Sequence, residues 1–332
     1  MVCKGPIESY PPPDKRKTPK VSAELLKRKQ ENVLKRSAAT NDFIRSQVEL
    51  VSKDRIIDKI SSLTSFHNRH SKSPNINMVA EWIMNELNSF GDNITYHEYV
   101  KENYQLKNVV YHKQGATDKI LLFCAHYDTI LSDRREDIDA RAPGADDNAS
   151  GVSSLIEVYR IISKLDTEYR LRFVFFSGEE QGLWGSTQYA QDVKDRNEDL
   201  HAVINLDICA EAGFLGSNNT TNVDIDDGTT GSVSSNNEAS LLLGEKMEQM
   251  AIDYTDLNVV NQWPIDNSDY MPFEARGYVC IGAYDGSVVE GNTHYHSETD
   301  LPSNLNMDLL TSLTKMVLAF ALSEAQIREQ VI

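Results

Sequence analysis

The sequence has few cysteines, no long apolar run and no excess of positive charge. Its 332 residues include four cysteines, none of them in a C-x-x-C pair. No disulfide framework is therefore predicted, and a reducing compartment is favoured. Three of the four, Cys124, Cys209 and Cys280, lie in apolar, strand-like runs, where buried free thiols are expected. No apolar run reaches about 18 residues, so no membrane span is expected.

The charge is acidic and unevenly distributed. The chain carries 33 Lys and Arg against 50 Asp and Glu, a net charge of −17, which argues against nucleic acid or an anionic membrane as the main partner. Residues 1–57 differ, because they hold 13 basic and 7 acidic residues. We expect residues 1–57 to form a basic N-terminal extension, partly disordered or helical, ahead of a folded domain at 58–332. The extension is either a solvated arm or a leader that docks on the acidic body.

Strand-like and helix-like segments alternate along the folded part of the chain. The nearly continuous apolar runs at 119–128, 171–180 and 201–210 are typical of strands buried on both faces of a parallel sheet. Helical periodicity predicts helices at 76–90 and 151–165. The alternation predicts an α/β fold, a three-layer helix–sheet–helix sandwich around a mostly parallel mixed sheet. The polar stretch 213–238 is expected to be a loop region with room for a hairpin.

Acids and imidazoles follow the ends of the predicted strands, where ligands bind in open α/β sheets. These residues are His126, Asp128, Asp146, Asp147, Glu179, Glu180, Asp207, His294 and His296. Imidazole and carboxylate without thiolate suit a divalent ion such as zinc. Several carboxylates at one edge would repel one another without a cation, and two ions about 3.5–4 Å apart can share one carboxylate. A shared ligand would account for the adjacent acids Asp146 and Asp147.

Five stretches together resemble the zinc aminopeptidases of the MH clan, metallopeptidase family 28, which includes bacterial leucyl aminopeptidase. They are HYD (126–128), PGADDNASG (143–151), SGEEQGLWGS (177–186), NLD (205–207) and HSETD (296–300). The resemblance covers roughly residues 58–325 and includes SLTSFHNRHSK (62–72). It implies a zinc exopeptidase fold of the phosphorylase/hydrolase-like type, so that 58–332 would be the catalytic domain.

The resemblance also implies a role for each residue of the site. Two zinc ions per chain are expected, with Asp146 shared between them. His126 and Asp207 would complete one ion, and Glu180 and His296 the other. Glu179 would be the general base, while Asp128 and Asp300 would orient His126 and His296. The family has a cis peptide bond after its shared aspartate, which places the bond at Asp146–Asp147.

The histidines divide into those with a motif and those without one. His296 is preferred over His294 as the ligand because it begins the H-S-x-x-D pattern. Ser268-Asp269-Tyr270 stands where the family usually has Ser-Asp-His. His67, His70, His97, His112 and His201 have no motif context and are expected at the surface. The side-chain pocket for substrate is expected from segments 208–216 and 262–284.

The implied activity is hydrolysis of peptides with a free N-terminus. Glutaminyl-peptide cyclisation is an alternative on the same fold, but that group uses a single zinc. A carboxypeptidase or dipeptidase of the clan is less favoured, since the interval from Asp207 to His296 is too short for a lid domain. A non-catalytic scaffold is disfavoured because all expected ligands and the base are present. The start of the chain shows no apolar signal segment, which favours a cytoplasmic protein, while the resemblance leaves secretion open; the sequence does not give the oligomeric state.

Overall fold

A single mixed sheet organises the chain. The computed structural model describes residues 41–91, 93–210, 219–228, 234–285 and 292–327. The eight strands lie in the order β1-β2-β4-β3-β5-β8-β6-β7. They are β1 (Ile94–Lys101), β2 (Tyr104–Lys113), β3 (Ile120–His126), β4 (Arg170–Phe176), β5 (Leu200–Leu206), β6 (Thr220–Ile225), β7 (Asn258–Pro264) and β8 (Cys280–Tyr284). The central strands β4, β3, β5 and β8 are parallel, whereas β1, β2 and β6 join through antiparallel pairs. The predicted mostly parallel mixed sheet is confirmed.

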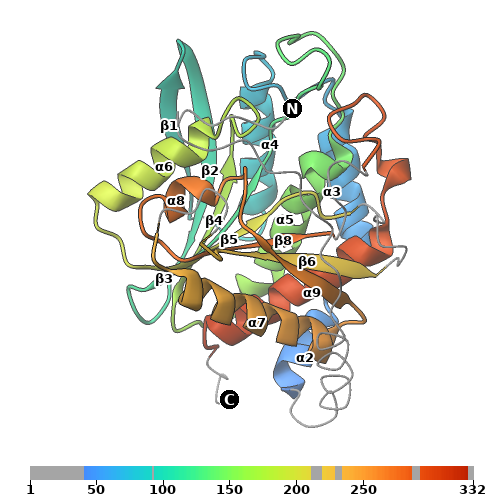
Figure 1. The fold of residues 1–332 in the computed structure, drawn as a ribbon. Helices are drawn as coiled ribbons and strands as arrows, with labels where there is room; N and C mark the ends of the chain where they lie inside the picture. Colours follow the sequence, from blue (N-terminus) through green and yellow to red (C-terminus); the bar gives the residue numbers. More distant parts are fainter. Residues whose placement is uncertain (1–40, 92, 211–218, 229–233, 286–291, 328–332) are drawn as a thin grey trace.

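Helices cover both faces of the sheet, as Figure 1 shows. They are α2 (Asp42–Val48), α3 (Lys53–Ser65), α4 (Ile76–Asn88), α5 (Gly151–Ile162), α6 (Trp184–Asp195), α7 (Asn237–Tyr254), α8 (Met271–Glu274) and α9 (Met307–Glu324). Alternate residues of β3 point to opposite faces. Leu121 and Phe123 belong to a core cluster with residues of α3, α4, α5, α7 and α9, while Leu122 and Cys124 belong to a second cluster with residues of α6 and α8. The two clusters are the two apolar interfaces of a three-layer sandwich.

The edges of the sheet were not predicted in full. β1 and β7 come from stretches for which no strand was expected, and β6 lies in the predicted loop region. β6 does not form a local hairpin; it pairs with β7 in parallel and with β8 in antiparallel orientation. Its sequence, TTNVDI, is polar, yet its residues are buried. The pairing therefore depends on contacts with distant strands.

The start of the described chain packs on the sandwich. Ile44 and Val48 of α2 are buried in the larger core cluster, and α2 contacts α9. α3 runs through the predicted boundary at residue 57. Residues 41–57 thus pack against the rest of the fold, and residues 1–40 lie outside the described part. Within the described ranges, every helix is too short or too polar to traverse a lipid bilayer.

Candidate metal centre

The carboxyl ends of neighbouring parallel strands bring the predicted side chains together. His126 is the last residue of β3 and pairs in register with Phe176, the last residue of β4. Glu179 and Glu180 follow β4 after a short turn, and Asp207 follows β5, the neighbour of β3 on its other side. All four side chains are buried. This edge of the sheet is therefore a dense cluster of ionisable groups.

Asp147 stands at the centre of this cluster, between two imidazoles. Its Oδ1 lies 3.1 Å from Nε2 of His126, and its Oδ2 lies 2.9 Å from Nε2 of His296. Asp207 Oδ1 is 3.1 Å from the same nitrogen of His126, and Glu180 Oε1 is 2.8 Å from that of His296. Each oxygen of Asp147 thus belongs to a separate half-site, one with His126 and Asp207 and the other with His296 and Glu180.

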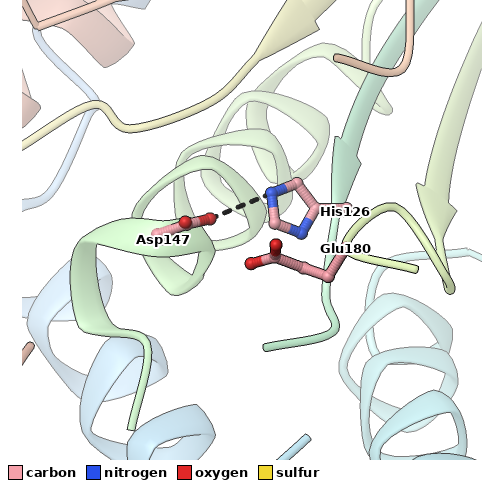
Figure 2. A group of neighbouring side chains, drawn as sticks. All are labelled: His126, Asp147 and Glu180. Carbon is pink, nitrogen blue, oxygen red and sulfur yellow. Dashed lines mark ion pairs between the residues drawn. The ribbon is translucent and has the colours of Figure 1, made fainter. Parts of the chain in front are cut away.

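Donor atoms from both half-sites lie close enough together to hold a metal ion. Potential ligand atoms of His126, Asp147 and Glu180 all lie within 4.8 Å of one another. Figure 2 shows the three side chains converging from the end of β3, the turn before α5 and the loop after β4. They combine imidazole and carboxylate donors, which is the chemistry of a zinc site. The residues present therefore fit the metal that the sequence implied.

The structure places Asp147, and not the Asp146 expected as the shared ligand, between the two imidazoles. The Asp146 carboxylate accepts hydrogen bonds from the main-chain N of Ala210 (2.8 Å) and from Nδ2 of Asn292 (3.3 Å). The turn begins at Gly144 in the left-handed region, and Asp147 has φ −108° and ψ 93°, outside the helical range. This backbone directs Asp147, and not its neighbour, at the imidazoles. The cis peptide bond likewise joins Asp147 to Asn148.

Two further carboxylates, Asp128 and Asp300, each hold a pair of adjacent main-chain amides. Asp128 accepts from the N–H groups of Glu179 (3.1 Å) and Glu180 (3.2 Å). Asp300 accepts from those of Asp146 (2.8 Å) and Asp147 (3.1 Å). Each carboxylate therefore fixes the backbone that carries a candidate ligand.

Of the contacts expected between these two acids and the imidazoles, the structure shows the one from Asp128 to His126, while the Asp300 carboxylate is directed elsewhere. His126 Nδ1 lies 3.2 Å from the main-chain oxygen of Asp128 and 3.7 Å from its Oδ1. Asp128 therefore lies against His126 as expected, although its carboxylate is directed mainly to amides. The carboxylate of Asp300 serves the Asp146–Asp147 turn, so the expectation that it orients His296 is corrected.

Asp207 has one oxygen in the cluster and the other outside it. Its Oδ2 accepts hydrogen bonds from Oγ of Ser268 (2.7 Å) and from the hydroxyl of Tyr284 (3.3 Å). Neither donor was predicted. Tyr284 ends β8, so the signal for it is the same strand-end position that identified the acids. Hydrogen-bond donors in such positions orient a carboxylate that binds a metal, and their loss lowers the metal affinity.

The electrostatics of the cluster follow from burial and opposite charge. Burial opposes ionisation of Asp147, yet His126 and His296 hold the pKa of its carboxyl below the usual value. Burial lowers the pKa of His296, but the carboxylates of Glu180 and Asp147 outweigh it and raise that pKa to about 10. Burial raises the pKa of Glu179 well above its ordinary value; His126 lowers it, and Glu180 and Asp207 add to the rise. Burial and the neighbouring carboxylates therefore favour the protonated form of Glu179.

A fully buried arginine lies beneath the cluster. Arg69 donates to four main-chain oxygens, those of Tyr127 (2.7 Å), Leu63 (3.2 Å), Pro143 (2.5 Å) and Gly144 (2.8 Å). Burial lowers its pKa to about 10, and Asp300 and Asp147 act against that shift. Arg69 therefore joins the segment after β3 to the turn that carries Asp147.

The remaining predicted residues are placed as follows. His294 is partly exposed, and its Nδ1 lies 2.8 Å from Oγ1 of Thr299, so it is His296 that reaches the cluster. His70 is buried, contrary to the surface position expected for it. Of the segments expected to form the substrate pocket, residues 211–216 lie outside the described residues.

Buried imidazole and carboxylate donors at the carboxyl edge of a mostly parallel α/β sheet are typical of an enzyme that binds a metal ion. The match to a model of one protein family agrees with this and identifies the family. The chain belongs to peptidase family M28, whose model matches residues 108–321. It is accordingly a metallopeptidase.

Two of the curated relatives carry the names of peptidases. The chain is 24% identical over 296 residues to a probable leucine aminopeptidase of Arthroderma otae, covering 86% of this chain and 76% of the relative. It is 30% identical over 189 residues to a probable zinc metalloprotease of Pyrenophora tritici-repentis, covering 51% of this chain and 39% of the relative.

The fold is similar to those of an aminopeptidase and of a glutaminyl cyclase. The LapA aminopeptidase of Legionella pneumophila has a TM-score of 0.73 at 19% identity, covering 95% of this chain and 79% of that one. A glutaminyl cyclase of Fimbriiglobus ruber has a TM-score of 0.66 at 14% identity, covering 84% and 96%. At these identities the likeness establishes the fold alone.

Proposed function

We propose that this protein is a di-zinc aminopeptidase that removes residues from the free N-termini of peptides. The observation that carries the proposal is the position of Asp147, whose two oxygens face two different imidazoles, each with a further carboxylate of its own. His126 and Asp207 would hold one ion, His296 and Glu180 the other, and Asp147 both. When bound, zinc in such a site polarises the scissile carbonyl and lowers the pKa of a water toward about 7.

Glu179 would move the proton during hydrolysis. It lies directly before Glu180 and is buried at the cluster, with its amide held by Asp128. It would take a proton from the attacking water as the oxygen adds to the carbonyl carbon. It would then return that proton to the amine nitrogen as the C–N bond breaks. Burial raises the pKa of this carboxyl, which makes it a stronger base than an ordinary carboxylate and so suits it to take up the proton.

Exchange of Glu179 tests this role. Glu179→Gln keeps the size of the side chain but cannot accept the proton, so turnover of aminoacyl-nitroanilides should fall by about 100-fold or more. Zinc content should stay as in the parent protein, because Glu179 is not among the proposed ligands. Glu81→Gln, at an exposed position on α4, is the matched control. Retained turnover with metal bound would reject the assignment of Glu179.

A free α-amine is expected to be the group by which the enzyme recognises its substrates. The amine nitrogen would bind beside the proposed ions, and acetylation removes its basicity and its ability to act as a ligand. We expect dipeptides with a free N-terminus to be cleaved and their acetylated forms to be spared. Equal cleavage of both would contradict an aminopeptidase.

Glutaminyl-peptide cyclisation is the alternative on this fold. This activity is considered because the fold is similar to that of the Fimbriiglobus ruber glutaminyl cyclase. The presence of both half-sites around Asp147 favours the peptidase, because the cyclases use a single zinc. Incubation with a peptide beginning in glutamine distinguishes the two: release of free glutamine supports the peptidase, and a product lighter by one ammonia supports the cyclase.

A further inference from the structure

Asp146 is buried beside Asp147, but its carboxylate is directed away from the imidazoles toward two loops. One loop follows Asp207 and the other precedes His296. We propose that Asp146 is a positioning residue, which fixes these two loops relative to Asp147 and so sets the distance between the two half-sites. This inference rests on the di-zinc function proposed above.

Two hydrogen bonds attach the first loop to the acidic turn, and a third lies within the turn. Asp146 Oδ1 accepts from the main-chain N of Ala210 at 2.8 Å. Ser150 Oγ accepts from the main-chain N of Cys209 at 3.1 Å and donates to the main-chain oxygen of Asp146 at 2.6 Å. Ala210 stands three residues after Asp207. The turn therefore restrains the chain just beyond the ligand of the first half-site.

The second loop is attached through Asn292. Its Nδ2 donates to Asp146 Oδ2 at 3.3 Å. Its Oδ1 accepts from the main-chain N–H groups of His294 and Tyr295, each at 2.8 Å. These two amides lie directly before His296, which has a left-handed φ of 51°, and the ring of Tyr295 stacks on the imidazole with centroids 3.7 Å apart. Asn292 thus carries the restraint from Asp146 to the ligand of the second half-site.

Asp146 needs both of its acceptor oxygens for this task. In Asp146→Asn the new side chain could still accept from Ala210, but its amide nitrogen would then face the amide nitrogen of Asn292. A buried donor left without an acceptor is costly, and the loop would move to relieve it. The arrangement should tolerate an exchange of the two residues, because the asparagine side chain introduced by Asp146→Asn could then donate to the carboxylate introduced by Asn292→Asp. That carboxylate would still accept from the amides of His294 and Tyr295.

Swapping the residues at positions 146 and 292 tests whether Asp146 acts through Asn292. Zinc affinity is measured by competition with a chromophoric chelator for the parent protein, Asp146→Asn, Asn292→Asp and the double variant, together with unfolding in urea. Asp146→Asn should weaken zinc binding by about tenfold or more, as changes next to metal ligands do. The double variant should recover affinity to within about threefold of the parent. Thr314→Val removes a buried hydrogen bond between α9 and α5, and should lower stability while zinc affinity stays unchanged.

Asn292→Ala provides a second route if Asp146→Asn does not fold. It releases only the loop before His296, so one of the two zinc ions should bind about tenfold more weakly and the other as before. Parent-like zinc affinity in Asp146→Asn and Asn292→Ala, or a double variant weaker than both single ones, would overturn the inference. If the parent protein bound a single zinc, the di-zinc proposal would be wrong. The same comparison on that ion would still decide whether Asp146 positions its ligands.

Discussion

Replacement of Arg69 by methionine should be among the most destabilising single changes in this fold. The side chain is fully buried, and its guanidinium serves four main-chain oxygens from three segments. A buried acceptor left without its donor costs about 1–3 kcal/mol, so four of them amount to at least about 4 kcal/mol. A whole domain is stable by about 5–15 kcal/mol, so much of that stability would be lost. Methionine fills a similar volume, which keeps the cavity small.

The assay is urea unfolding followed by circular dichroism. Arg69→Lys should recover part of the loss, because an ammonium group has three donors but cannot span the four oxygens as a planar guanidinium does. Arg55→Met is the matched control, since Arg55 is half-exposed and its ion pair with Glu157 is 3.9 Å long; about 1 kcal/mol or less is expected there. A loss below about 1 kcal/mol for Arg69→Met would refute the reasoning that Arg69 secures this part of the fold.

Two further predictions concern pH and metal affinity. Burial and the guanidinium of Arg172 lower the pKa of His112 to about 4, so the imidazole stays neutral in the folded protein, whereas the unfolded chain takes up a proton below about pH 6.5. The free energy of unfolding should therefore fall as the pH drops from about 6.5 to about 4. In urea titrations His112→Gln should make this fall with pH less steep. An equally steep fall in the variant would contradict the assignment to His112. Ser268→Ala removes the shorter hydrogen bond to Asp207 Oδ2 and should weaken zinc binding by about tenfold, measured by chelator competition. Unchanged affinity would show that the hydroxyl does not support the ligand.

The sequence predicted the centre of the fold better than its edges. The runs that became β3, β4 and β5 are apolar on both faces, so burial could be inferred without knowing their neighbours. β1 could not be found in this way, because ITYHEYVK is an edge strand with polar residues on its exposed face. β6 is polar and buried, and its place between β8 and β7 depends on partners far away in the chain.

The sequence predicted which types of residue form the candidate site, but it named Asp146 where the structure places Asp147. His126, Glu180, Asp207 and His296 lie where strand ends and motif order placed them. The choice between Asp146 and Asp147 depended on two adjacent residues of the same type. It is decided by the backbone of the turn after Gly144 and by contacts with Ala210 and Asn292, far away in the chain. Neither feature can be read from the residues of the turn alone.

The zinc content of the parent protein and of Asp147→Ala, measured by mass spectrometry after gel filtration, tests most directly whether this carboxylate is shared. We predict two zinc ions per chain for the parent protein. Asp147→Ala should retain less than one, because each half-site loses an oxygen and the remaining carboxylates repel one another. Two ions bound to Asp147→Ala, or a single ion bound to the parent protein, would contradict a metal centre organised around Asp147.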